Sequence, residues 1–417
     1  MEFHTQQIAK KKRNDIANTV VSHTINHLPD DVMVDILCRL PTKQLSTTAC
    51  VSKTWFRLIV ASCFPKIATG ISYLGLILRV ETILQHPRVT FCKTDSMRVH
   101  RFGSAPIPNS CSKILPFKVS AKSLIDCCNG LLLFCHRNKA ETKSLYYYHV
   151  LNSVTKQCVT VPKPGKTALN MYAALAYEPC ESSYYKIVRF QGLRCLNIYS
   201  SETKKWKTVK FHLDSHVTEA QWLEQSLYFK GAIYRISMSG HLLRFVVDEE
   251  VSVNNQAQAI DLPEIAKRCP RGCVGLNNDQ IHFAVYDKPD LCIWVLEHQL
   301  FRSNIHTFKW NLKCRFSCTR IHTMENKYCV LPMAFHPYTD SVYVGTSSQW
   351  GSSLFCLKPS SEAPYYEGRV REYHKAISYI DGHLNWDHVF AYPMLQSYVP
   401  FASGFAMTTH PDGMFLP

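Results

Sequence analysis

The 417-residue sequence lacks the features that mark membrane and secreted proteins. Its longest strongly apolar runs, Gly70 to Leu78 and Gly130 to Cys135, are far shorter than the roughly 20 residues that cross a bilayer. The first 21 residues are polar and basic and contain no apolar stretch like that of a secretory signal. No Asn-x-Ser/Thr sequon occurs in the chain. We therefore expect the 18 cysteines to be reduced thiols in a protein of the cytoplasm, the nucleus or both.

Signatures of catalysis are also missing, because the chain contains no Gly-x-Ser-x-Gly and no His-Glu-x-x-His. Residues 164–167 end like a phosphate-binding loop, but Thr160 stands where that motif requires glycine. Two cysteine clusters lack the regular pairing of structural zinc sites and are better explained as strand thiols: Cys314-x3-Cys318-x3-His322 and Cys269-x3-Cys273. We predict no catalytic residue, no metal and no cofactor.

A short region near the N-terminus has the periodicity of small helices. Met33, Ile36, Leu37 and Leu40 recur at helical spacing behind two aspartates, and Pro41 ends the pattern. Thr42 and Ser52 are candidate caps for a second and a third helix. A helical unit this small buries little surface of its own. Its apolar content therefore suggests a partner surface.

The remainder has the alternation of short strands and contains an internal repeat. Residues 149–161 align with residues 197–209 at an offset of 48. Further apolar residues follow at about the same spacing at Val246 and Trp294. Another follows at Leu354, after a longer gap of about 60 residues. Four strands in each unit of roughly 48 residues is the period of a β-propeller blade. The pattern predicts a large all-β propeller of about six blades.

The segment from Leu28 to Ile59, LPDDVMVDILCRLPTKQLSTTACVSKTWFRLI, resembles an F-box. Downstream, Asp126–Leu133 and Leu151–Lys156 resemble the "CNGLL" strand and the "NP-x-T" turn of the F-box-associated domain of plant-type F-box proteins, with Ser153 in place of proline. The propeller is kelch-like in this comparison, although the paired glycines of kelch repeats are missing. The expected organisation is a flexible basic tail (1–22), a three-helix F-box (23–66) and the propeller (67–417).

The resemblance implies a function without catalysis. F-box proteins are substrate-recognition subunits of SCF-type ubiquitin ligases, which dock on a Skp adaptor and, through it, join cullin and RING subunits. The propeller would hold a substrate protein that the sequence does not identify, and we expect no membrane partner. The sequence does not separate adaptor-facing residues from those of the small core, so the resemblance implies one combined set: Leu28, Pro29, Ile36, Leu37, Leu40, Pro41, Leu45, Val51, Ser52, Trp55, Leu58 and Ile59.

The net charge of +15 leaves a second interpretation open, a propeller that binds nucleic acid. Residues 113–210 carry 16 basic and 5 acidic residues, whereas residues 211–417 carry 17 and 20. The charge is therefore local, which makes nucleic acid the less favoured partner. Four lysines at or near polar turns form a candidate patch that steers an acidic partner, with a merely solvated edge as the alternative: Lys156, Lys204, Lys205 and Lys207.

Overall fold

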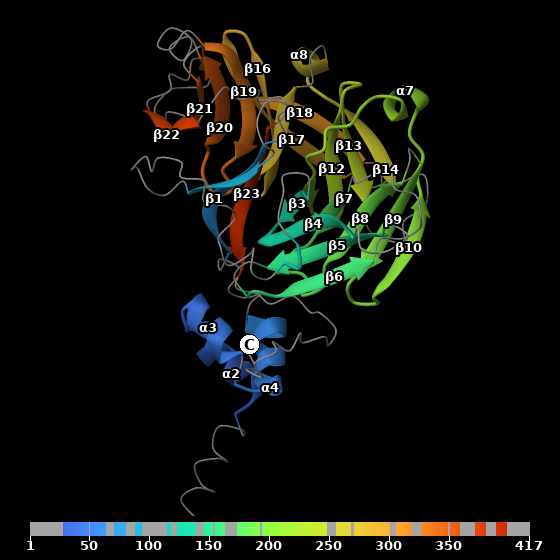
Figure 1. The fold of residues 1–417 in the computed structure, drawn as a ribbon, viewed down its shortest axis with the longest axis vertical. Helices are drawn as coiled ribbons and strands as arrows, with labels where there is room; N and C mark the ends of the chain where they lie inside the picture. Colours follow the sequence, from blue (N-terminus) through green and yellow to red (C-terminus); the bar gives the residue numbers. More distant parts are fainter. Residues whose placement is uncertain are drawn as a thin grey trace, which may run out of the picture. The chain divides into compact units, whose positions relative to one another are not determined.

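A computed structural model gives the structure of the chain (Figure 1). It describes residues 28–49, 51–63, 71–80, 88–93, 115–117, 123–138, 145–152, 155–162, 173–191, 194–247, 256–267, 271–300, 306–318, 327–348, 351–358, 372–380 and 389–397. The chain forms two compact units. One contains the helices before Gly70, and the other contains the strands from Ile71 onward. The predicted basic tail lies outside the described residues.

The first unit contains the three predicted helices, α2 (Asp30–Cys38), α3 (Thr42–Thr48) and α4 (Lys53–Leu58), followed by a π-helical turn, η1 (Ile59–Cys63). Asp30 and Asp31 lie in the first turn of α2, where the helix dipole favours negative charge. The Ser52 hydroxyl caps α4 by accepting a hydrogen bond from the Trp55 N–H at 3.1 Å, as predicted. The prediction for Thr42 is wrong, because Pro41 takes the cap position and Thr42 is already helical.

Short helices of this kind are stabilised mainly by a shared core. Helix α4 has no fully buried residue. In the described part of the helical unit the buried apolar side chains come from α2, from α3 and the residue that follows it, and from η1: Met33, Val34, Leu37, Leu45, Ala49, Ile59 and Cys63.

The second unit consists of antiparallel sheets, and five of those described have four strands. Blade B is β3 (Leu124–Cys128), β4 (Leu131–Asn138), β5 (Leu145–Asn152) and β6 (Cys158–Pro162). Blade C is β7 (Ala173–Ala176), β8 (Lys186–Gln191), β9 (Cys195–Ser200) and β10 (Lys205–Lys210). Blade D is β11 (Leu227–Phe229), β12 (Ala232–Ser237), β13 (His241–Val246) and β14 (Ala257–Asp261).

Blade E is β15 (Gly272–Asn277), β16 (Gln280–Asp287), β17 (Asp290–Leu300) and β18 (His306–Ser317). Blade F is β19 (Lys327–Phe335), β20 (Val342–Ser348), β21 (Gly351–Lys358) and β22 (Glu372–Ile380). The closing sheet has three strands, β2 (Arg88–Lys93), β1 (Ile71–Val80) and β23 (Val389–Ser397). Two four-residue helices, α7 (Ser215–Thr218) and α8 (Glu264–Lys267), lie in the connections on either side of blade D.

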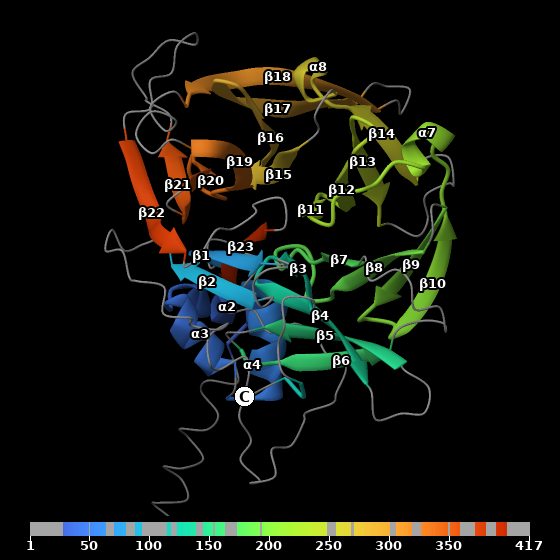
Figure 2. The same cartoon turned by 45° about the horizontal axis from the view of Figure 1, so that its top comes forward.

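The first strands of blades B to F line the centre of a ring, with the outer strands at its rim (Figure 2). Around the centre β3 contacts β7, β7 contacts β11, β11 contacts β15 and β15 contacts β19. β23 completes the cycle by contacting both β19 and β3. The structure is therefore a β-propeller, as predicted, with five four-stranded blades; a count of about six and a kelch-like character are not confirmed.

The 48-residue repeat marks the same strand in every blade. Residues 149–161 form the end of β5, its turn and β6, and residues 197–209 form the matching hairpin of β9 and β10. Val246, Trp294 and Leu354 lie on β13, β17 and β21, which are the third strands of blades D, E and F. The sequence period thus corresponds to the step from one blade to the next.

Apolar side chains from facing blades form the core between them. Blades B and C share one buried cluster, in which Leu133 and Tyr148 pack with Leu175 and Ile187. Similar clusters join blades C and D, D and E, and E and F. Because each blade buries both faces, its middle strands are buried almost throughout, as β12 is along Ala232–Ser237, where Arg235 and Ser237 are buried together with the apolar residues.

Asp126 on β3 links three blades near the centre. Its Oδ2 accepts hydrogen bonds from the Leu175 N–H on β7 at 2.8 Å and from the Ser226 hydroxyl before β11 at 2.9 Å. The side chain is 2% exposed, and this burial raises the pKa of the carboxyl from 3.8 to about 6, against the opposing effect of its hydrogen bonds.

This shift predicts a specific pH dependence of stability. The native carboxyl takes up its proton near pH 6, whereas the unfolded chain does so near 3.8, so the native state is stabilised as pH falls from 7.5 to 5. The gain is on the order of 1 kcal/mol over that window. Asp126→Asn should lack it, as urea denaturation of both proteins at pH 7.5 and 5 would show. Identical pH dependence in the two proteins would contradict this assignment.

Candidate functional site

The structure divides the predicted adaptor-binding residues into a buried and an exposed set. Leu37, Leu45 and Ile59 are buried in the core, and three others are half-buried: Leu40, Trp55 and Leu58. The remaining six are exposed: Leu28, Pro29, Ile36, Pro41, Val51 and Ser52. The sequence set therefore mixed residues that hold the helices together with residues that are available to a partner.

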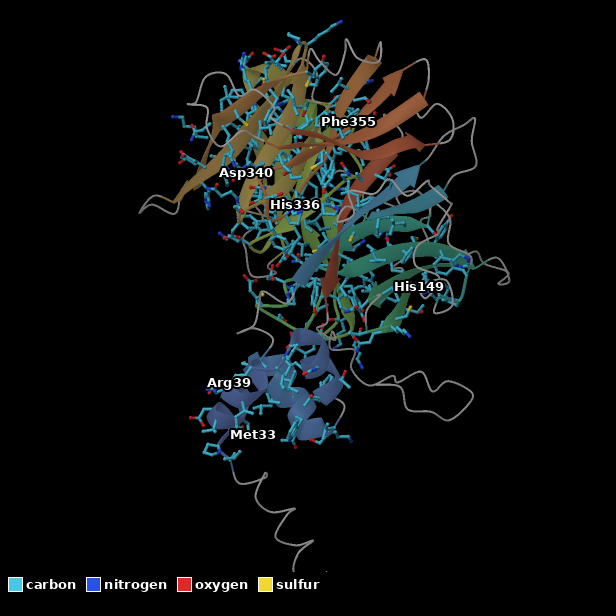
Figure 3. The ribbon with its side chains drawn as sticks, turned by 90° about the vertical axis from the view of Figure 1, so that its left-hand side faces the viewer. Met33, Arg39, His149, His336, Asp340 and Phe355 are labelled. Atoms are coloured by element: carbon cyan, nitrogen blue, oxygen red, sulfur yellow. The ribbon has the colours of Figure 1, made fainter. Side chains whose placement is uncertain are left out.

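Helix α2 carries apolar residues on two faces. Its inner face supplies Met33, Val34 and Leu37 to the core. Figure 3 labels Met33 on this helix and Arg39 directly after it. A separate set of exposed residues, called the α2 stripe, consists of Leu28, which lies two residues before the helix begins, and of Val32 and Ile36 on the helix; they are 40%, 40% and 48% exposed. Val51 and Phe56 are further exposed apolar residues of the helical unit. An outward stripe on a helix that already has a buried face is typical of a docking surface.

Two of these exposed residues, Val32 and Phe56, were missed by the sequence analysis. Val32 could have been found, because it lies one helical turn before Ile36. The polar edge of the stripe includes the ion pair between Asp35 and Arg39, whose closest atoms are 2.7 Å apart. Both side chains are highly exposed, so the pair contributes little to stability.

The four lysines of the candidate basic patch lie on blades B and C. Lys156 and Lys204 occupy matching positions in the turns before β6 and β10, and both have a positive φ, 58° and 56°. Lys205 and Lys207 follow on β10, the outer strand of blade C. All four are exposed. Lysine on an edge strand also prevents unwanted strand pairing, so the arrangement is compatible with either role.

The ends of the strands define two loop faces on the propeller. Because successive strands of a blade are antiparallel, the turn at 201–204 and the turn at 238–240 lie at opposite ends of the blades. The first turn joins a third strand to a fourth, and the second joins a second strand to a third. The loops at 200–205 and 239–241 therefore cannot contribute to one binding face.

A serine–histidine–aspartate chain occurs at the β12–β13 turn. The Ser239 hydroxyl lies 3.0 Å from His241 Nδ1, and His241 Nε2 lies 3.2 Å from Asp261 Oδ1. Such a chain could activate a serine, but acyl transfer also needs backbone N–H groups directed at the substrate. The N–H groups of Ser239 and Gly240 are instead donated to the hydroxyl and the carbonyl of Ser237. The hydrogen bonds among Ser239, His241 and Asp261 therefore stabilise the turn between β12 and β13.

The cysteines predicted to be strand thiols have that environment where the structure describes them. Cys273 and Cys318 belong to the buried cluster between blades E and F, and Cys314 packs against it. Burial raises the pKa of the Cys314 and Cys318 thiols to about 12, which keeps them protonated. Cys269 and His322 lie outside the described residues. No group of three or more metal-ligating side chains is found among those described.

Two family models match the chain. The F-box domain matches residues 25–66, which include α2 to α4. The model described as "F-box protein At3g26010-like, beta-propeller" matches residues 88–358, more than half of the chain. The chain belongs to this family of F-box propeller proteins. The sequence resemblance to F-box proteins is thereby confirmed.

Individual F-box proteins are similar to the chain over different lengths. F-box protein At5g65850 of Arabidopsis thaliana is 25% identical over 175 residues, which span 40% of this chain and 39% of that protein. Putative F-box protein At1g47790 of Arabidopsis thaliana is 24% identical over 382 residues, 84% of this chain and 87% of that protein. Nothing in these matches supports the nucleic-acid alternative.

Solved propeller structures are only distantly similar. The N-terminal domain of Nup159 has 10% identity and a TM-score of 0.34, with 73% of this chain and 67% of that chain covered. The β-propeller domain of the Trilobed protease from Pyrococcus furiosus has 11% identity and a TM-score of 0.30, with 56% and 80% covered. TM-scores this low establish no functional relationship. No helix in the described residues is long and apolar enough to cross a bilayer.

The division of the F-box into core and surface can be tested in the full chain. Leu45 is fully buried, so Leu45→Ala should destabilise the helical unit by about 2–5 kcal/mol. Val51 is 68% exposed, so Val51→Ala should leave its stability nearly unchanged. Amide hydrogen exchange read by mass spectrometry would show faster exchange in α2 to α4 only for Leu45→Ala. Equal exchange in the two variants would refute the division.

Proposed function

We propose that this F-box protein is a substrate-recognition subunit of an SCF-type ubiquitin ligase. The F-box docks on a Skp-type adaptor, which connects the chain to cullin and RING subunits, and the propeller binds the protein to be ubiquitinated. Proteins that combine an F-box with a propeller of this family are typically non-catalytic adaptors. The chain then acts by proximity, since two binding sites on one chain raise the local concentration of substrate at the ligase.

The α2 stripe is the observation that carries this proposal. Leu28, Val32 and Ile36 expose apolar surface that the core of the helical unit does not use. Burying a fully exposed side chain of this size contributes roughly 1.5–3 kcal/mol, and since these three are 40–48% exposed, covering each contributes about half of that or less. The family match to the F-box, residues 25–66, supports a Skp-type adaptor as the occupant.

Two finer features extend the proposal to the propeller. We assign the closing sheet as a sixth, three-stranded blade, since β23 contacts the inner strands of both neighbours. Lys156, Lys204, Lys205 and Lys207 steer an acidic region of the substrate or partner toward blades B and C. The expected location of the complex is the cytoplasm, the nucleus or both.

Docking is tested by co-expressing the full chain with a Skp-type adaptor and measuring how much adaptor co-purifies. Ile36→Asp places a charge in the apolar contact and should weaken the complex at least 10-fold. Ile36→Leu keeps the apolar surface and is the matched control, with binding close to that of the wild type. Leu40 and Trp55 are less suitable positions, because both are half-buried and their substitution would also disturb folding.

The wild-type chain must form the complex for the proposal to stand. Failure of the wild-type protein to retain any adaptor would sink the ligase assignment. Full retention by Ile36→Asp would instead show that the adaptor binds elsewhere on the chain.

A further inference from the structure

Two cysteines lie on elements of the helical unit that pack against each other. Cys38 is the last residue of α2, and Cys63 is the last residue of η1. Helix α2 and η1 are in contact, although the two cysteines are 25 positions apart in the chain. Cys38 is half-buried, whereas Cys63 is fully buried. Neither thiol takes part in the proposed function.

Each of these thiols lies against backbone next to the other cysteine. Cys38 Sγ lies 3.9 Å from the carbonyl oxygen of Cys63. Cys63 Sγ lies 4.0 Å from the carbonyl oxygen of Val34, one helical turn before Cys38. A helical side chain leans over the turn that precedes it, so the Cys38 thiol is directed toward the same turn of α2. Both sulfur atoms therefore lie in one gap between α2 and η1.

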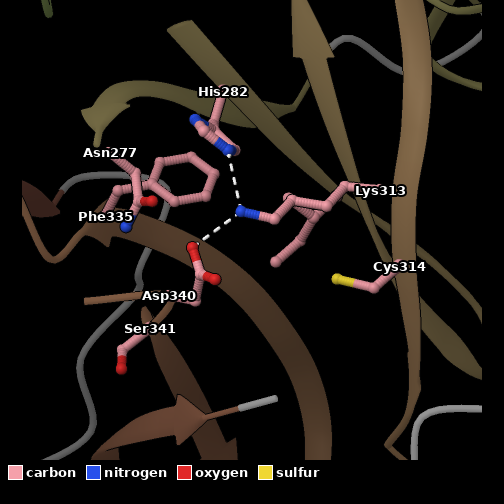
Figure 4. A pocket seen from close by; sticks show the side chains of 8 residues that line it. Asn277, His282, Lys313, Cys314, Phe335, Asp340 and Ser341 are labelled. Carbon is pink, nitrogen blue, oxygen red and sulfur yellow. Dashed lines mark hydrogen bonds and ion pairs between the residues drawn. The ribbon is translucent and has the colours of Figure 1, made fainter. Parts of the chain in front are cut away.

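Buried thiols of the propeller do not form a comparable site. Burial raises the pKa of the Cys314 and Cys318 thiols to about 12 and that of Cys158 to about 11. Figure 4 shows Cys314 on β18 next to Lys313, in the contact between blades E and F. Because the thiolate is the reactive form of cysteine, these thiols are poor nucleophiles near neutral pH.

We propose that Cys38 and Cys63 form a modification site, at which a peroxide joins α2 to η1 through a disulfide. Cys38 reacts first, because it is the thiol of the pair that solvent reaches. Cys63 is the resolving thiol, since it lies against the turn of α2 that Cys38 covers. Disulfides of this kind in reducing compartments are usually transient and redox-sensing.

The reaction takes two steps and one molecule of peroxide. The Cys38 thiolate attacks one peroxide oxygen, the O–O bond breaks, and hydroxide leaves as water with the proton that Cys38 has lost. This step leaves a sulfenic acid on Cys38. The Cys63 sulfur then attacks the Cys38 sulfur, the S–O bond breaks, and the hydroxyl leaves as water with the Cys63 proton. The two thiols lose two electrons, and the peroxide gains them.

The disulfide stabilises the helical unit without covering the α2 stripe. It closes a loop that contains α3 and α4, and closing a loop restricts the unfolded chain. This matters for a unit with so small a core. Ile36 of the stripe lies two residues before Cys38, about 200° around the helix, so the cross-link is on the other side of α2. The site goes beyond the proposed function and does not depend on it.

The test treats the full chain with hydrogen peroxide, alkylates the remaining thiols and digests the protein with trypsin without reduction. Mass spectrometry should find the peptide with Cys38 joined to the peptide with Cys63, with the loss of two hydrogens. The three cysteines of this region fall in separate tryptic peptides: Cys38 in residues 14–39, Cys50 in residues 44–53 and Cys63 in residues 58–66.

Three variants separate the roles of the thiols. Cys38→Ser should abolish the link. Cys63→Ala should abolish it as well and leave the sulfenic acid on Cys38, which dimedone labels. Cys195→Ser is the matched control, because Cys195 is a half-buried thiol at the start of β9, and it should keep the link.

Unlinked peptides in the peroxide-treated wild type would overturn the proposal, as would a link from Cys38 or Cys63 to Cys50 instead. Loss of the link in Cys195→Ser would also overturn it.

Amide hydrogen exchange tests the stabilising effect. In the linked wild type, α2 to α4 should exchange at least about 10-fold more slowly than in the reduced protein. Peroxide should leave the exchange of Cys38→Ser unchanged. Equal exchange in the linked and the reduced wild type would contradict the stabilising role of the disulfide.

Discussion

The antiparallel pairing of β1 with β23 is the constraint on which the propeller depends. It joins Ile71–Val80 to Val389–Ser397, segments more than 300 residues apart in the chain. Every blade buries its apolar faces against its neighbours, so an open ring would expose the faces of the first and last blades. β23 prevents this by contacting β3 on one side and β19 on the other. The central carboxylate of Asp126 adds a polar link between blades B, C and D.

Local sequence patterns predicted much of this fold, but they did not predict which strands far apart in the sequence pair with each other. The 48-residue offset between residues 149–161 and 197–209 located equivalent hairpins, because a blade is a local unit with a local period. The short helices followed from apolar spacing and from the cap at Ser52. The closing sheet was not predictable in detail, because nothing in the sequence near Ile71 indicates that its partner strand begins at Val389.

The candidate site residues also divide into those that a sequence pattern locates and those that only the fold distinguishes. Motif resemblance located the F-box, but the motif contains core residues such as Leu45 together with surface residues such as Ile36, and only the fold separates them. The ion pair between Lys313 and Asp340 was not predictable from the sequence, since the two residues lie on different blades and Lys313 is the extra residue of a β-bulge. The proposed adaptor surface thus depends on which apolar residues of the motif the fold leaves exposed.

The central claim is that the exposed stripe of α2 is the surface by which the chain joins a ligase. It is tested most directly by amide hydrogen exchange of the full chain with and without a bound Skp-type adaptor. The account predicts slower exchange confined to the F-box, strongest in α2 around Val32 and Ile36, with the propeller strands unchanged. Protection located on the propeller, or none in α2, would contradict it.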